Sequence, residues 1–283
     1  MWPFSSPPKI PVLRLSGPIG MASPLRPSMS LATLAGPIER AFNYSKLPAV
    51  AVVINSPGGS PTQSNLIFKR LRQLSEEKKK KVYVFCEDVA ASGGYFLAVA
   101  GDEIYADDSS IVGSIGVIAA SFGFVEALNK LGIERRVYTA GENKSILDPF
   151  KPAQEVDIER LKSIQLDIHE VFKGVVRSRR GDKLKGPESE LFSGAFWVAG
   201  KAQELGLIDG ITDVRTKMRE LFGDKVVLHN IKLQSGGLLS RLRRPSLQAP
   251  LLADAPTDGL RLEFAEDLVS TVEKRMLWQR YGL

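Results

Sequence analysis

Apolar runs alternate with amphipathic stretches along most of the chain, and this alternation sets the expected fold. The runs at 10–19 and 49–56 are mostly apolar and are closed by Gly and Pro, a pattern typical of strands buried on both faces of a sheet. From 155 to 180 apolar residues recur every three or four positions, which predicts a long amphipathic helix. Strands alternating with helices indicate an α/β fold with a largely parallel sheet.

The same patterns place the other elements. Further strands are expected at 82–86, 103–106, 109–120, 134–139 and 225–231, and further helices at 31–43, 61–77, 93–100 and 122–131. The stretch 191–211 is expected to form a strand, a helix and a glycine-marked turn.

The composition changes after residue 233, which divides the chain into three parts. Residues 1–233 form the predicted catalytic domain, and 234–257, rich in Gly, Ser, Pro and Arg, have the composition of a linker. Residues 258–283 are expected to form an amphipathic helix with Phe264, Leu268, Val272 and Met276 on one stripe. Because its polar face carries several carboxylates, we expect this helix to dock onto the body or a sister subunit rather than to anchor in a membrane surface.

Composition and charge exclude several classes of protein. The chain has 283 residues, 43% of them hydrophobic, which is enough for a full core. Its net charge of +6 comes without basic motifs interleaved with aromatics, so no nucleic-acid partner is expected. The single cysteine, Cys86, lies in an apolar run. It excludes a disulfide framework, argues against a thiol–metal site and is expected in the core.

No membrane-spanning segment or leader is expected. The chain has no apolar stretch of about eighteen residues, and its first twenty residues lack the apolar segment of a signal peptide. We therefore expect a cytoplasmic protein. The basic sequence "RLRRP" at 241–245 leaves peripheral contact with anionic lipid open.

Two glycine-rich turns carry the candidate chemistry. "INSPGGS" at 54–60 and "AASGGYF" at 90–96 each place Gly-Gly directly after an apolar strand. Such turns expose amide N–H groups at the start of a helix, where they can hold developing negative charge as an oxyanion hole does. Ser92 alone would more often be a helix cap, but a serine in the second of two such turns favours a nucleophile.

A nucleophilic serine needs a base, and the residues alone leave its identity open. His169 lies in the long amphipathic helix and His229 at the end of a late strand, contexts typical of structural or surface histidines. A lysine can serve where burial lowers its pKa. Lys144 lies in the loop "YTAGENKSILDPF" with apolar residues after it, and this loop could fold over a site and desolvate the amine. Lys151 is the competing candidate.

Five motifs occur in the order of a known family: "VINSPGG", "ASGGYF", "VGSIGV", "AGENKS…DPF" and "FSGAFWVAGKAQELGLID". Over residues 10–214 the chain resembles signal peptide peptidase A and SohB-type serine peptidases. The resemblance implies a single copy of a domain with a fold similar to Clp protease and crotonase. It also implies a Ser/Lys dyad in which Ser92 is the nucleophile and Lys144 the general base and acid.

The resemblance further implies the remaining parts of the site. The N–H groups of Gly59 and Gly93 are the expected oxyanion hole, with Gly58 shaping the turn. Ser114, in "VGSIGV", is expected to touch substrate or to orient Lys144, and a purely structural hydroxyl is the alternative. Remnant signal peptides or membrane-derived segments are the implied substrates. A ring of copies that complete each other's sites is the implied assembly. No cofactor, metal or ATP is expected.

Three other functions stay open at this point. A crotonase-type acyl-CoA hydratase or isomerase shares the paired turns but needs no nucleophilic serine. A catalytically silent peptide-binding scaffold would carry the same residues without assembling them. A Clp-type Ser-His-Asp peptidase would use His169 or His229 as its base.

Overall fold

The computed structural model describes residues 7–20, 28–141, 143–233 and 275–282. Within these residues the strands are β1 (Lys9–Ser16), β2 (Ala49–Ser56), β3 (Lys81–Ala91), β4 (Glu103–Ala106), β5 (Ile111–Gly113), β6 (Phe196–Val198), β7 (Gly210–Ile211) and β8 (Val227–Asn230). The helices are α1 (Leu31–Tyr44), α2 (Pro61–Lys78), α3 (Gly93–Ala98), α4 (Val125–Leu131), α5 (Glu155–Arg180), α6 (Glu188–Leu191), α7 (Ala199–Glu204) and α8 (Val214–Phe222), with a 3-10 turn at Gly181–Lys183.

The strands of the described residues form one sheet in the order β6-β5-β3-β2-β1-β8, with β4 paired to β3 and β7 paired to β4. Each pairing is parallel except that of β5 with β6. This arrangement confirms the predicted α/β class and the largely parallel sheet.

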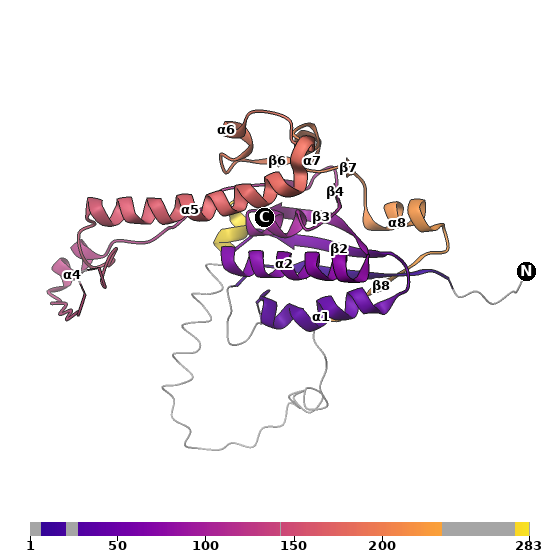
Figure 1. Ribbon diagram of the computed structural model, residues 1–283. Coiled ribbons are helices and arrows are strands. Elements are labelled where there is room, and N and C mark those ends of the chain that lie inside the picture. Colours follow the sequence, from indigo (N-terminus) through magenta and orange to yellow (C-terminus); the bar gives the residue numbers. More distant parts are fainter. Residues whose placement is uncertain (1–6, 21–27, 142, 234–274, 283) are drawn as a thin grey trace, which may run out of the picture.

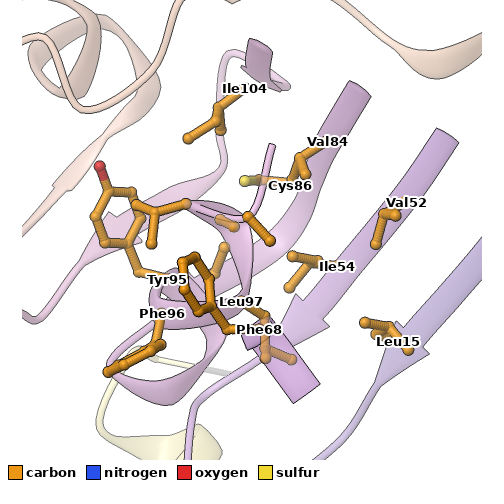
Figure 2. Packing of buried hydrophobic residues seen from close by; sticks show 14 of the residues in the cluster. Leu15, Val52, Ile54, Phe68, Val84, Cys86, Tyr95, Phe96, Leu97 and Ile104 are labelled. Carbon is orange, nitrogen blue, oxygen red and sulfur yellow. The ribbon is translucent and has the colours of Figure 1, made fainter. Parts of the chain in front are cut away.

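Helices cover both faces of the sheet (Figure 1). On one face the larger core cluster joins side chains of β1, β2 and β3 to α1, α2 and α3 and to the second half of α5. Figure 2 shows Phe96 and Leu97 of α3 with the strand residues Ile54 and Val84 in this cluster. On the other face a smaller cluster includes Met218 of α8. Burial on both faces explains why β2 reads as an uninterrupted apolar run.

Strand β3 changes its pairing partner along its length and ends at the candidate nucleophile. Its residues Tyr83–Cys86 pair with β4, whereas Val89–Ala91 pair with β5. The strand ends at Ala91, so Ser92 follows directly and α3 begins at Gly93. The short charged stretch Glu87-Asp88, where β3 changes partner, is the reason the sequence indicated only the first half of this strand.

A second region extends away from this body. Figure 1 shows α4 and the first half of α5 projecting from the sheet. We call residues 117–165, described except for 142, the arm. The buried side chains of α5, namely Phe172, Val176 and Arg180, all lie in its second half. The helix therefore anchors the arm through its C-terminal half.

Several expected elements match and one is wrong. The predictions for 103–106 and 155–180 agree with β4 and α5. The strand expected at 134–139 does not form: these residues lie on the arm, are exposed and have no regular structure. Among the residues that the structure describes, no strand lies beside the arm for them to pair with. The strand expected at 109–120 is limited to β5, because the chain leaves the sheet after Gly113.

The C-terminal part is described only near its end. The expected linker 234–257 and the first part of the expected helix, 258–274, lie outside the described residues. In the short helical turn that follows, Tyr281 is buried against Val89 and Ala91 of β3, with Trp278 beside it. Its ring also meets Phe196 edge-on. This end of the chain therefore packs on the body. Among the described helices, none combines the length and apolar character needed to cross a bilayer.

Candidate active site

Ser92 lies at a strained turn between β3 and α3. Its backbone angles are φ 53 and ψ −122, a region that costs a non-glycine residue on the order of 1–3 kcal/mol. The Ser92 N–H donates to the Gly113 carbonyl at 2.8 Å, and the side chain makes no capping bond to the helix. The hydroxyl of a half-buried serine is thus held at a sharp strand-to-helix turn, the geometry that presents a nucleophile.

Gly58 and Gly59 lie against this turn without room for side chains. A Cβ on Gly58 would be 2.8 Å from the Gly93 nitrogen, and one on Gly59 would be 2.1 Å from the Ile19 carbonyl oxygen. Both residues also have positive φ, 102 and 143, which disfavours any side chain. The close approach of the two Gly-Gly turns therefore requires glycine at 58, and the close approach of Ile19 requires it at 59.

The amides of Gly59 and Gly93 lie beside each other at this point. The Gly59 nitrogen is 3.2 Å from where a Cβ of Gly93 would stand. The Gly58 N–H bonds to Ser56 Oγ at 3.2 Å, whereas the bridge between Gly59 and Ile19 uses the Gly58 carbonyl and the Ser60 N–H. Gly93 is the first residue of α3, where an N–H has no intrahelical acceptor. The N–H groups of Gly59 and Gly93 are thus close to Ser92 and to each other, and their role as an oxyanion hole stays a prediction.

A cavity of about 300 Å³ opens next to Ser92. It is bounded by α2, α3, α5 and the segment after β5. Its lining residues are Gly59, Pro61, Thr62, Asn65, Ser92, Gly93, Phe96, Gly116, Val117, Ile168, Val171 and Phe172. Most of this lining is apolar. The main polar addition is Asn65, whose Oδ1 is buried and finds no donor within the described parts of the chain. Such a cavity suits an apolar side chain.

The sequence did not indicate the walls of this cavity. Ile168 and Phe172 belong to the apolar stripe of α5, which predicted helix packing but not a pocket. Asn65 gave no signal, because a single amide on an amphipathic helix is ordinary. Tyr95, next to Phe96, is fully buried and donates to the Leu207 carbonyl at 2.8 Å. It holds α3 in place rather than lining the cavity.

Ser114 lies two residues before Gly116, which lines the cavity, but Ser114 itself does not line it. It is 5% exposed, has φ 54, and its N–H donates to the Ala195 carbonyl at 2.6 Å. Its predicted contact with substrate or lysine stays a prediction.

Lys144 is on the arm, not at the cavity. It lies between α4 and α5, the segment that Figure 1 shows away from α3. Its side chain is exposed and its backbone N–H donates to the Gly141 carbonyl at 3.2 Å. Lys151 is exposed on the same segment. The expectation that this loop folds over the site and desolvates the amine is not met within one chain, because the arm directs the loop away from the body.

Neither histidine meets Ser92. His169 Nε2 lies 3.0 Å from the Ile115 carbonyl oxygen, and since a carbonyl only accepts, this nitrogen donates. His229 stacks on Tyr44 with ring centroids 4.1 Å apart, on β8 at the edge of the sheet beyond β1 and β2. Cys86 is buried as expected, and burial raises the pKa of its thiol to about 12. The thiol therefore stays protonated.

Comparison with known proteins adds the family. The profile of Peptidase family S49 matches residues 75–227, a span that includes Ser92, Gly93, Ser114 and Lys144. The chain belongs to peptidase family S49. This assignment confirms the predicted resemblance and the predicted enzyme class, a serine-type peptidase.

Among the relatives of this S49 chain, several are named as proteases and others carry the name of a transporter. A putative protease of Synechocystis is 30% identical over 263 residues, covering 90% of each chain. The chloroplastic serine protease SPPA of Arabidopsis thaliana is 29% identical over 86% of this chain and 36% of its own length. A Brucella abortus protein named Na(+)/H(+) antiporter NhaA is 52% identical over 97% of this chain.

The coverage of these relatives limits what their names convey. This S49 chain spans 37% of the Brucella protein and 36% of the Arabidopsis protein. The antiporter name belongs to a protein of which the matching segment is little more than a third. That segment contains the S49 region of this chain.

Proposed function

We propose that this chain is a serine endopeptidase that cleaves peptides through an acyl-enzyme formed on Ser92. The observation that carries the proposal is the position of Ser92: a serine in a strained strand-to-helix turn, at an apolar cavity, beside the amides of Gly59 and Gly93. A scaffold that only bound peptides would not need a serine in an unfavourable backbone conformation. The family assignment supports the same reading.

The proposed reaction uses the two amides and a lysine. The neutral amine of Lys144 takes the proton of the Ser92 hydroxyl as Oγ attacks the peptide carbonyl. The N–H groups of Gly59 and Gly93 bind the oxyanion of the tetrahedral intermediate. Lys144 then protonates the leaving amine, and water, activated by the same amine, hydrolyses the ester. The apolar cavity holds the side chain that precedes the cleaved bond.

We propose further that the lysine comes from a second copy of the chain. Lys144 is exposed on the arm and is not among the residues at the cavity, so an arm that reaches a neighbour would bring it to that neighbour's Ser92. A head-to-tail interface of this kind closes into a ring when its rotation permits.

The surface of the arm supports a second copy as the occupant. Large apolar side chains are exposed along it, with Tyr138 at 90% and Phe122 and Leu131 each at 71%. Further exposed apolar residues on the arm are Ile118, Phe124, Ile133, Phe150, Val156 and Ile164. A cluster of this size marks an interaction surface. Burying it would also remove water from around the amine, which favours the uncharged form that a general base requires.

Mixing two inactive variants tests the shared site. Ser92→Ala and Lys144→Ala are each expected to abolish cleavage of fluorogenic peptides. After the two are unfolded and refolded together in equal amounts, about half of the Ser92-bearing sites, which is about a quarter of all sites, should regain a lysine from a neighbour if pairing is random. Lys151→Ala is the matched control and should stay active alone.

The outcomes separate the alternatives. If each single variant is inactive and the mixture also stays inactive, the lysine acts within its own chain or another base is used. If Lys144→Ala keeps activity and Lys151→Ala loses it, Lys151 is the base. If wild type cleaves no peptide but binds acyl-CoA, the crotonase reading replaces this one. Remnant signal peptides and membrane-derived segments remain the first substrates to test, and the expected cytoplasmic location stays a prediction for cell fractionation.

A further inference from the structure

His169 joins the two places where the arm leaves and rejoins the body. The chain leaves the sheet after β5 through Ser114–Val117 and returns along α5, which carries His169 in its middle. His169 Nε2 donates to the Ile115 carbonyl at 3.0 Å across 54 positions of sequence. The bond therefore links the two segments that connect the arm to the body.

The same two segments form two adjoining walls of the cavity at Ser92. Gly116 and Val117 line it from the segment after β5, and Ile168, Val171 and Phe172 line it from α5. His169 follows Ile168 directly, and Ile115 precedes Gly116. A hydrogen bond between His169 and Ile115 thus fixes the spacing of the two walls at the point where both border the cavity.

Few other hydrogen bonds hold the first wall. In the described residues, the Gly116 N–H returns to the Ser114 carbonyl at 3.0 Å, a bond within the segment itself. The Ser114 N–H reaches the Ala195 carbonyl, but this bond precedes the wall. From Ile115 to Val117, the bond from His169 is the one that ties the described backbone to another element. The Ile115 side chain adds packing in the core.

We propose that His169 is a positioning residue that sets the width of the substrate pocket by holding the 115–117 wall against α5. The proposal rests on the proposed peptidase function for its readout but not for its geometry. His169 does not touch the reacting atoms. Its loss would let the wall move, which weakens the binding of substrates whose apolar side chain fills the cavity and leaves the serine chemistry largely intact.

The test compares His169→Leu with His169→Gln. Leucine has no donor, whereas the glutamine amide can donate to the Ile115 carbonyl. With peptides carrying leucine before the cleaved bond, His169→Leu should raise KM about five- to tenfold, the effect of about one hydrogen bond, with kcat changed much less. Peptides carrying alanine there should be affected less. His169→Gln should recover most of the wild-type KM, and His229→Gln is the control histidine outside the site.

Hydrogen exchange gives a readout that does not need activity. The amides of residues 115–118 should exchange faster in His169→Leu than in wild type, and His169→Gln should restore their protection. This measurement separates the two proposals: if wild type cleaves no peptide, the function fails, whereas the exchange result still supports or rejects the clamp.

Three results would overturn the proposal. His169→Leu with wild-type KM and wild-type exchange would show that the bond does not hold the wall. A loss of kcat at constant KM would make His169 part of the reaction. A raised KM accompanied by a lower oligomeric mass in light scattering would place its role in assembly.

Discussion

The body around Ser92 and the arm that carries Lys144 differ in how far their apolar side chains are buried. In the body, β2, β3 and α3 are almost wholly buried, and a side chain at Gly58 or Gly59 would collide with backbone. On the arm, α4 has no buried residue in the single chain, and its large apolar side chains face solvent. The body buries its apolar side chains within the described part of one chain, whereas the arm leaves many of its apolar side chains exposed.

The difference concerns how the groups of the proposed reaction are held in position. The nucleophile and its two amides are held by packing within one chain, since strain at Ser92 can persist only where the surroundings fix it. The proposed base, Lys144, lies on a segment whose apolar side chains are exposed in the single chain. In the proposed assembly, the site is completed only when two chains meet.

The largest expected effect compares two serines of the body. Ser92→Ala should lower kcat by roughly 10⁴-fold or more, since the hydroxyl is the proposed nucleophile. Ser114→Ala should lower it less than about tenfold, because Ser114 is buried and does not line the cavity. Steady-state cleavage of one fluorogenic peptide measures both. A Ser114→Ala enzyme as inactive as Ser92→Ala would move Ser114 into the catalytic machinery.

The next prediction changes the exposed apolar surface of the arm and leaves the body unchanged. Leu131→Glu places a charge on the exposed apolar surface and should reduce the oligomeric mass, with a loss of activity of about a hundredfold or more as Lys144 is withdrawn. Leu221→Glu, a 39% exposed leucine on α8, is the matched control. Light scattering and peptide cleavage are measured together. An unassembled Leu131→Glu enzyme with full activity would show that one chain suffices.

An effect of similar size tests the close approach of Gly59 to Ile19. Gly59→Ala must displace the Ile19 carbonyl, 2.1 Å from the new Cβ, and so misplace one oxyanion donor. The expected loss is about a hundred- to a thousandfold in kcat. Gly174→Ala, a helical glycine with no atom within 4 Å of the new Cβ, should keep activity and gain up to about 1 kcal/mol of stability. Equal activity in the two variants would contradict the oxyanion assignment.

The smallest functional effect concerns how the body anchors α5. Arg180 is 3% exposed and bonds to the Gly206 carbonyl at 2.7 Å and to Asp209 at 2.8 Å. Arg180→Met should lower the free energy of unfolding by about 3–5 kcal/mol, with little change in kcat. Arg177, on the same helix as Arg180, forms an exposed pair with Glu188 of α6. Arg177→Met should cost about 1 kcal/mol or less. Denaturant unfolding measures both.

The contact between Arg180 and Asp209 also predicts how the free energy of unfolding depends on pH. Burial alone would raise the pKa of Asp209, but the bonds from Arg180 and Lys183 outweigh it and hold that pKa below its usual value. A carboxylate with a lowered pKa in the folded state contributes stability above its unfolded pKa of about 4, and this contribution is lost as pH falls through the folded value. Unfolding of wild type should therefore become easier below about pH 4, and Arg180→Met should show less of this dependence.

The body could be predicted from the sequence to a large extent. The apolar run of β2, the helical period of α5 and the two Gly-Gly turns reflect burial and backbone geometry within one chain, and such features leave a local pattern. Ser92 was found because its turn has a sequence signature. The confirmed family follows from the order of these same motifs.

The arm could not be predicted in the same way. Residues 134–139 have a strand-like pattern, but the described part of the chain offers them no neighbouring strand. The apolar residues after Lys144 suggested a loop that buries its own amine, whereas they lie on a segment directed away from the body. The cavity walls Asn65, Val117 and Ile168 come from three separate elements, and their meeting depends on tertiary packing that no local spacing shows.

The backbone of Ser92 also implies a conflict between folding and reactivity at a single position. With φ 53 and ψ −122, this site would suit glycine better than serine. Ser92→Gly should therefore yield a more stable protein, by about 1 kcal/mol or more, that cleaves nothing. Selection for stability alone would remove the hydroxyl, so screens for thermostable variants that ignore activity should recover glycine at residue 92.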